Sequence, residues 1–256
     1  MIDYDVLLVS HEKDYHKLDI VLTHIKKNIV GYNQIHLIVK DKSKLNLSFR
    51  DVVIHNENDI LNVDFSKFKY RPNWIYQQML KLFQKVTLNK YLMLDSDVVV
   101  LKKICPFSEN QKPIFFFRDD QNHQPYFDWM KKYFNLDRVH NYSFISEIIL
   151  FDREIINNIF ADIGLIEIND IINFFYESNT KDAHIGEPEL YGNYIKTKFK
   201  DLYEEKNLTS ASSGIHGVTE TDKHLYSNIW AKETINEIVN NSPNVDVLVF
   251  HSWLKI

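Results

Sequence analysis

The segment Tyr91-Leu92-Met93-Leu94-Asp95-Ser96-Asp97 joins a short apolar run to two aspartates. Such a run predicts a buried strand, and this one delivers both carboxylates to its end. If the chain stays extended there, Asp95 and Asp97 point the same way, because side chains i and i+2 of a strand share a face. Two neighbouring like charges are costly without a positive partner, and the hard carboxylate oxygens favour Mg²⁺ or Mn²⁺. The alternative is a strand end that turns into solvent with two surface acids.

Around this segment, apolar strands alternate with amphipathic helices. The alternation predicts an α/β fold with a mainly parallel central sheet flanked by helices. Arg71-Pro72-Asn73 introduces the helix before the aspartates, and Asn73 is expected to cap it. The strands predicted in the first half are Val6–Val9, Ile35–Val39, Val52–Ile54 and Tyr91–Leu94, and the helices are Asp14–Val30 and Trp74–Val86.

The second half of the chain is less regular. Thr209–Thr221 is polar and contains glycine, so it is predicted to be a loop. The strands predicted here are Ile114–Phe117, Ser143–Phe151 and Val245–Phe250, and the helices are Tyr126–Phe134, one that follows Asp152, Ile166–Ser178, Glu189–Thr197 and Tyr226–Asn240. Because no repeat or linker interrupts these elements, a single domain over residues 1–256 is the simplest interpretation.

The composition excludes several classes of protein. The 256 residues include only 6 glycines and neither glycine-rich phosphate-loop motif, so any bound phosphate needs other ligands. The lone Cys105 excludes a disulfide framework and a cysteine-based zinc site. A net charge of −5 without a long basic stretch argues against nucleic-acid binding. No signal peptide is recognisable and no apolar run approaches the ~20 residues of a membrane span. These features predict a soluble, cytoplasmic protein.

Two further segments carry side chains that suit a ligand site. An apolar strand ends at His251-Ser252-Trp253, and imidazole is a common metal ligand. One face of the helix after Arg71 is suited to hydrogen-bond a base or a phosphate, although it also fits an ordinary polar surface. The residues on that face are Trp74, Gln78, Lys81 and Lys85.

Glu187 and Glu189 flank Pro188, a residue that suits the start of a helix. Acids in this pattern are candidates for a general base and for an acceptor ligand. The helix dipole also favours acids at a helix start, so the pattern alone leaves both explanations open.

Together these segments resemble a glycosyltransferase of the GT-A type, a class with a nucleotide-sugar-binding α/β domain. Asp95-Ser96-Asp97 followed by V-V-V-L-K is similar to the Y-L-D-x-D-hydrophobic-K stretch of glycogenin-like and lipopolysaccharide hexosyltransferases, and His251 resembles their C-terminal metal-binding histidine. The stretches R-P-N-W-I-Y-Q-Q-M-L-K, S-F-I-S-E-I-I-L-F-D and E-P-E-L-Y-G-N-Y are closer to uncharacterised bacterial and viral glycosyltransferase-like proteins. The resemblance runs from Asp5 to Trp253. The glycine-containing segment that ends K-P-W after the histidine is absent, which leaves a phosphate contact by Lys255 open.

The resemblance implies metal-dependent transfer of a sugar from a nucleotide-sugar donor, a UDP-sugar by preference, to a saccharide or glycoconjugate acceptor. It implies that Asp97 and His251 bind Mn²⁺ or Mg²⁺ and that Asp95 binds the metal or the ribose. Residues 1–105 are expected to form the nucleotide-sugar half, and residues 106–256 the acceptor half with the metal-ligand strand. The residues expected to contact the nucleotide sugar are Ser10, Asp41, Arg71, Gln78, Lys81, Asp95 and Ser96.

In an inverting enzyme of this type, the resemblance makes one of Glu187 and Glu189 the general base, and the other grips the acceptor. In a retaining enzyme, Glu147 is the candidate for lining the β-face of the donor sugar. Two other functions remain open. A haloacid-dehalogenase-like phosphatase also uses D-x-D after an apolar strand, and a protein of the same fold can bind a nucleotide sugar or carbohydrate without turnover.

Overall fold

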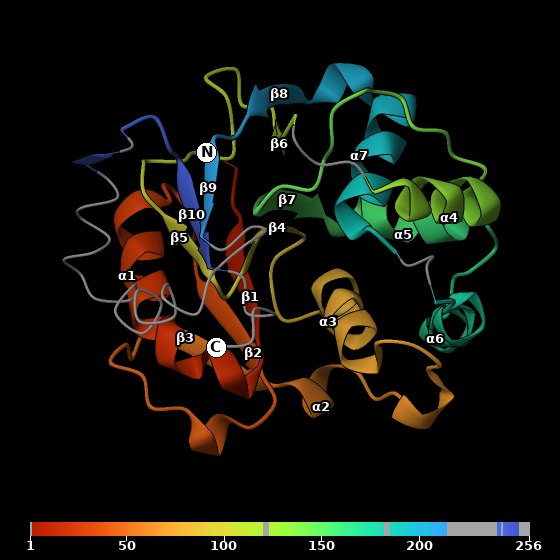
Figure 1. The fold of residues 1–256 in the computed structure, drawn as a ribbon, viewed down its shortest axis with the longest axis horizontal. Helices are drawn as coiled ribbons and strands as arrows, with labels where there is room; N and C mark the ends of the chain where they lie inside the picture. Colours follow the sequence, from red (N-terminus) through yellow and green to blue (C-terminus); the bar gives the residue numbers. More distant parts are fainter. Residues whose placement is uncertain (1, 120–122, 182–184, 214–239, 242, 251–256) are drawn as a thin grey trace.

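The computed structural model describes residues 2–119, 123–181, 185–213, 240–241 and 243–250. Its centre is a five-stranded sheet in the order β3-β2-β1-β4-β7 (Figure 1). β1 pairs in parallel with β2 and with β4, β2 pairs in parallel with β3, and β7 runs antiparallel to β4. This sheet confirms the predicted α/β class. The strands are β1 (Asp5–Ser10), β2 (Ile35–Val39), β3 (Val52–Asn56), β4 (Lys90–Asp95) and β7 (Ile148–Asp152).

Helices cover both faces of this sheet because alternate side chains of its buried strands point to opposite sides. Val6 and Leu8 of β1 belong to a core with helix α1 (Leu18–Asn28). Leu7 and Val9 belong to a second core with helix α3 (Pro72–Phe83), so α1 and α3 lie on opposite faces (Figure 1). The other helices are α2 (Glu57–Ile60), α4 (Gln124–Phe134), α5 (Arg153–Ala161), α6 (Ile168–Ser178) and α7 (Glu187–Lys198).

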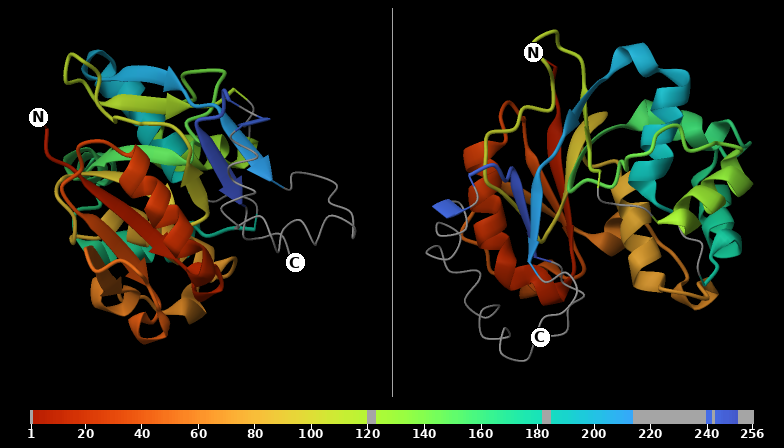
Figure 2. Two further views of the ribbon diagram at one scale, coloured as in Figure 1. Left: turned by 90° about the vertical axis from the view of Figure 1, so that its left-hand side faces the viewer. Right: turned by 45° about the horizontal axis from the view of Figure 1, so that its top comes forward.

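Two smaller sheets accompany the central one (Figure 2). In the first, β10 (Val247–Phe250) pairs antiparallel with β5 (Val98–Val100) and parallel with β9 (Ser210–Ser213). In the second, β6 (Ile114–Phe117) pairs in parallel with β8 (Glu204–Asn207). Strand β5 follows β4 after two residues, so the chain leaves the central sheet immediately after Asp95.

Three predicted elements differ from the structure for identifiable reasons. Only Ile148–Asp152 of the predicted strand 143–151 pairs as β7, whereas Ser143 exchanges both of its backbone hydrogen bonds with Arg118. The predicted loop 209–221 contains β9, which has no local strand signal and forms by pairing with β10. The predicted helix 14–30 begins as a 3-10 turn over Glu12–Lys17 before α1 starts at Leu18.

The predicted cap of α3 is also wrong. The helix begins at Pro72, with Arg71 as its N-cap residue and no side-chain cap hydrogen bond. The proline ring pre-sets the first helical turn, so the helix starts ahead of Asn73.

Strands β5 and β8 were not predicted, and the predicted helix 226–240 lies outside the described residues except for Asn240. Within the described residues, no helix combines the length and the apolar character that a membrane crossing requires.

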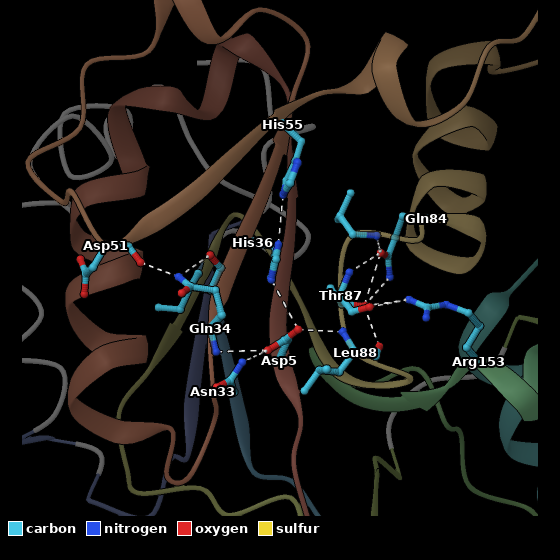
Figure 3. Close-up of polar contacts among 12 residues, drawn as sticks. Asp5, Asn33, Gln34, His36, Asp51, His55, Gln84, Thr87, Leu88 and Arg153 are labelled. Carbon is cyan, nitrogen blue, oxygen red and sulfur yellow. Dashed lines mark hydrogen bonds and ion pairs between the residues drawn. The ribbon is translucent and has the colours of Figure 1, made fainter.

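A chain of polar contacts crosses strands β1, β2 and β3 (Figure 3). His36 Nδ1 lies 3.0 Å from His55 Nε2, and His36 Nε2 lies 3.4 Å from Asp5 Oδ2. Asp5 also accepts the backbone N–H of Gln34 at 3.1 Å and that of Leu88 at 2.7 Å. These contacts join three neighbouring strands near the start of β1.

Candidate functional site

A cleft of about 860 Å³ opens at the carboxyl ends of β1 and β4. Parallel strands present their carboxyl ends at one edge of a sheet, which is where open α/β folds bind ligands. The cleft brings together most of the residues that the sequence suggested for the site. Those that line it are Ser10, Arg71, Gln78, Lys81, Asp95, Ser96, Asp97 and Glu147.

Asp95 and Asp97 both line this cleft, although not for the reason expected from an extended chain. β4 ends at Asp95, Ser96 and Asp97 form a turn, and β5 begins at Val98. β10 runs antiparallel to β5 towards this turn, with Val249 opposite Val98. The turn therefore lies between two sheets, and the end of β10 approaches it. His251, the predicted third metal ligand, lies outside the described residues.

Lys81 is the buried cation of the cleft, with a side chain that is 4 % exposed. Its Nζ lies 2.8 Å from Asp95 Oδ1 and 3.1 Å from Glu187 Oε1. Burial alone lowers the pKa of a lysine, but the carboxylates of Asp95 and Glu187 outweigh burial and hold the pKa of Lys81 above its usual value. The side chain therefore stays charged at the floor of the cleft, held by helix α3.

Glu187 and Glu189 are buried at the start of α7 and are not among the residues that line the cleft. Burial raises the pKa of Glu187, with Lys81 opposing this effect. Burial also raises the pKa of Glu189, whose carboxylate accepts hydrogen bonds from Ser143 Oγ and, at 3.2 Å, from Asn193 Nδ2. Glu187 therefore reaches the cleft through Lys81, whereas Glu189 joins α7 to the segment before β7.

Asp41 lies apart from the cleft lining. It is the N-cap residue of a short 3-10 turn over Lys42–Lys44, and its carboxylate accepts the backbone N–H of Ser43 at 2.9 Å and the hydroxyl of Ser43 at 2.6 Å. These two hydrogen bonds lower the pKa of Asp41. The contacts give this carboxylate a local role in shaping the turn after β2.

Sequence reasoning missed the partner of Glu147. Glu147 lines the cleft just before β7, and its carboxylate forms an ion pair with the buried guanidinium of Arg118, which follows β6. Arg118 carries no motif of its own and lies 29 positions before Glu147, so no local signal marks the pair.

The carboxylates at the turn suit a hard divalent cation. Asp95 has one oxygen on Lys81, and its side chain is 43 % exposed, which leaves its second oxygen accessible. Asp97 lines the same cleft. Within the described part of the chain, no group of three or more His, Cys, Asp or Glu residues is arranged to hold a metal. By themselves, the two aspartates do not complete a metal site among the described residues.

The comparisons with known proteins give a family and a set of distant folds. No curated protein matches the chain. Among solved structures, mouse xyloside xylosyltransferase 1 in its apo form is 10% identical over 100% of both chains, with a TM-score of 0.43. Galactosyltransferase LgtC in complex with donor and acceptor sugar analogues is 12% identical over 98% of this chain and 88% of its own, with a TM-score of 0.45.

The glycosyltransferase GlyE of Streptococcus pneumoniae TIGR4 is 10% identical over 100% of this chain and 57% of its own, with a TM-score of 0.42. The model of a protein family described as a family of unknown function, DUF6492, matches residues 9–234. That match covers most of the chain, from the end of β1 through the aspartate turn and α7. The chain therefore belongs to DUF6492, a family of unknown function.

Proposed function

We propose that the cleft binds a nucleotide-sugar donor with a divalent cation and transfers the sugar to a saccharide or glycoconjugate acceptor. The observation that carries this proposal is the buried Lys81 ammonium, which lies 2.8 Å from Asp95 at the aspartate turn and lines the cleft of about 860 Å³. A fixed buried cation beside accessible carboxylates suits a ligand that carries both phosphate charge and a metal ion.

In this proposal Asp97 and His251 hold Mn²⁺ or Mg²⁺, and Asp95 holds the metal or the ribose. When bound, the ion neutralises the diphosphate as it departs. Ser10, Gln78 and Ser96 contact the nucleotide sugar, and Lys81 adds fixed positive charge at the leaving group. UDP is the preferred nucleotide. Asp41 is proposed to contact the nucleotide sugar from outside the cleft lining, where its carboxylate also accepts the backbone N–H of Ser43.

Transfer breaks the bond between the anomeric carbon and the diphosphate oxygen, and the electron pair leaves with the diphosphate. The acceptor oxygen forms the new bond and gives its proton to a base. The assignment of that base to Glu187 or Glu189 stays a prediction, and Glu147 is the cleft carboxylate for a retaining reaction. We also propose that the chain acts as a single unit, with residues 1–105 binding the nucleotide sugar and residues 106–256 binding the acceptor.

The test is a donor screen by calorimetry with manganese present. UDP and UDP-sugars should bind, and in a thermal-shift panel UDP should stabilise the protein more than GDP or CDP. Release of UDP from a UDP-sugar without acceptor, dependent on manganese, separates an enzyme from a binding protein. Stabilisation by GDP alone overturns the nucleotide assignment, and the absence of binding by any nucleoside diphosphate overturns the proposal.

A further inference from the structure

One face of helix α3 forms a wall of the cleft. Arg71, Trp74, Gln78 and Lys81 all line the cleft. Spacings of four and three residues place Trp74, Gln78 and Lys81 on one side of the helix, and Arg71 is its N-cap residue. Arg71 is exposed at one end, and Lys81 is buried at the other. A rise of 1.5 Å per residue separates their backbones by roughly 15 Å along the helix axis. The wall therefore carries a cation at each end.

The backbone of Arg71 adopts a conformation that glycine normally supplies. Its φ of 45° and ψ of 51° are left-handed, and it directly precedes Pro72. Side chains with a Cβ rarely adopt this region, and a following proline restricts the residue further. Such outliers persist only where the surroundings determine them, and they cluster at functional sites.

Contacts on both sides hold this conformation. The carbonyl of Arg71 accepts the N–H groups of Trp74 at 3.0 Å and Ile75 at 3.1 Å. The buried amide of Asn179 clamps the residue before it, accepting the N–H of Tyr70 at 2.7 Å and donating to its carbonyl at 3.0 Å. The chain is therefore fixed on either side of Arg71.

The side chain of Arg71 is oriented as well. Its guanidinium lies over the Trp74 ring, 4.6 Å from the centroid, and the Trp74 ring lies parallel to that of Tyr126 within 4°. Tyr126 reaches this position beside Gly186, where an added Cβ would be 2.7 Å from the tyrosine ring. A stacked guanidinium keeps its N–H donors at its edge, in the fork that matches phosphate and carboxylate. Among the described residues, no ion pair is formed by Arg71.

An independent observation on the same wall also indicates a polar ligand. Gln78 is 2 % exposed, and its Oε1 has no hydrogen-bond partner within the described part of the protein. A buried amide oxygen without a partner is costly, and the cost falls when a ligand hydroxyl or N–H group reaches it. The middle of the wall is therefore short of a hydrogen-bond donor.

We propose that Arg71 is a preorganised oxyanion-binding fork at the open end of the α3 wall, with Trp74 and Asn179 as its positioning residues. The ligand class is a phosphate or carboxylate group attached to a sugar or nucleotide that lies along the wall towards Lys81. Two sources share this chemistry, the diphosphate of the donor and an acidic group on the acceptor. The inference rests on the proposed function only in naming these sources.

The test compares Arg71→Gly, Arg71→Lys and the wild type in the full chain. Gln111→Gly is the matched control, because Gln111 also has a positive φ, 60°, and does not line the cleft. Binding of pyrophosphate and of glucuronate is measured by NMR titration, binding of UDP with manganese by calorimetry, and stability by denaturant unfolding. Pyrophosphate represents the donor source and glucuronate the acidic acceptor.

We expect Arg71→Gly to weaken binding of at least one of the two anions about tenfold or more, which is the scale of a charge-assisted bidentate hydrogen bond. Its unfolding midpoint should be no lower than that of the wild type, because glycine relieves the left-handed backbone. Arg71→Lys keeps the charge but loses the fork, so it should also bind more weakly. Gln111→Gly should leave binding unchanged.

Wild-type affinity of Arg71→Gly for both anions overturns the inference, as does a clear loss of stability, which indicates that the side chain serves the fold. Failure of both anions to bind the wild type also overturns it. Failure of UDP with manganese to bind the wild type refutes the proposed function instead. The two ideas therefore fail on different measurements.

Discussion

The ammonium nitrogen of Lys81 lies 2.8 Å from a carboxylate oxygen of Asp95, which connects helix α3 to the end of β4 at the floor of the cleft. The same nitrogen lies 3.1 Å from Glu187, more than a hundred residues further along the chain. One buried cation therefore fixes the first acid of the aspartate turn and the first residue of α7 relative to each other. This arrangement predicts that Lys81 contributes to stability, and the proposed function gives the same side chain a place in ligand binding.

Replacing Lys81 with Met should destabilise the protein by about 3–5 kcal/mol, because the buried carboxylate of Glu187 loses its cation. The double variant Lys81→Met with Glu187→Gln should recover much of that loss, since neither buried partner is then charged. Lys131→Met is the control, because Lys131 and Asp137 form an exposed pair worth less than about 1 kcal/mol. Denaturant unfolding gives the free energy of unfolding of all three variants. A Lys81→Met variant as stable as the control would contradict the role of Lys81 as the cation that balances the buried Glu187 carboxylate.

Asp97→Ala and His251→Ala should each abolish manganese-dependent UDP binding while the fold is retained. Both residues are proposed as metal ligands rather than as core residues. Calorimetry with UDP and manganese measures the loss, and circular dichroism checks the fold. Asp137→Asn, at an exposed site, should bind as the wild type does. Wild-type affinity for UDP with manganese in either ligand variant would refute the metal site.

The general base is tested with Glu187→Gln, Glu189→Gln and Glu147→Gln. If the reaction inverts, one of the first two should lower turnover by about 10²–10⁴-fold, which is the usual contribution of a general base, while UDP binding stays near that of the wild type. Glu187→Gln also weakens a partner of Lys81, so its UDP affinity needs separate measurement. A loss confined to Glu147→Gln, with retained anomeric configuration in the product, would instead support the retaining reaction. Near-wild-type turnover in all three variants would exclude every one of these carboxylates.

Stability should fall as the pH drops below about 6.5, the usual histidine pKa. Burial lowers the pKa of both His36 and His55. At His36 the carboxylate of Asp5 opposes the effect of burial, whereas at His55 the neighbouring His36 lowers the pKa further (Figure 3). The folded protein therefore favours the neutral imidazoles. The unfolded chain takes up protons first, so the stabilisation is complete above pH 6.5 and is lost as the pH falls towards the folded-state values.

The measurement is the denaturant midpoint between pH 7.5 and pH 5. Each extra proton bound by the unfolded chain changes the free energy of unfolding by at most about 1.4 kcal/mol per pH unit. The contribution of His55 is smaller, because its side chain is partly exposed to solvent. The double variant His36→Asn with His55→Gln should show a shallower slope, and the exposed His16→Gln should keep the wild-type slope. A double variant with an unchanged slope would show that other groups cause the pH dependence.

The hydrophobic pattern was sufficient to predict the buried parallel strands of the central sheet. The runs at β1, β2 and β4 are apolar and short, and burial on both faces leaves few other structures for them. β9 reads S-A-S-S and β8 reads E-E-K-N, which carry no strand signal. Their pairing depends on distant partners, so tertiary context overrides local propensity there.

By itself the sequence determined the α/β class and the place of Asp95, Ser96 and Asp97 at the end of a buried strand, because the position of a buried strand along the chain follows from a local apolar run. Only the tertiary structure decided that Lys81 pairs with both Asp95 and Glu187, that Glu147 faces the cleft, and that Arg71 is left-handed. These features come from contacts between segments far apart in the chain. Their free energies depend on burial and on geometry that exist only once the helices and sheets have packed together.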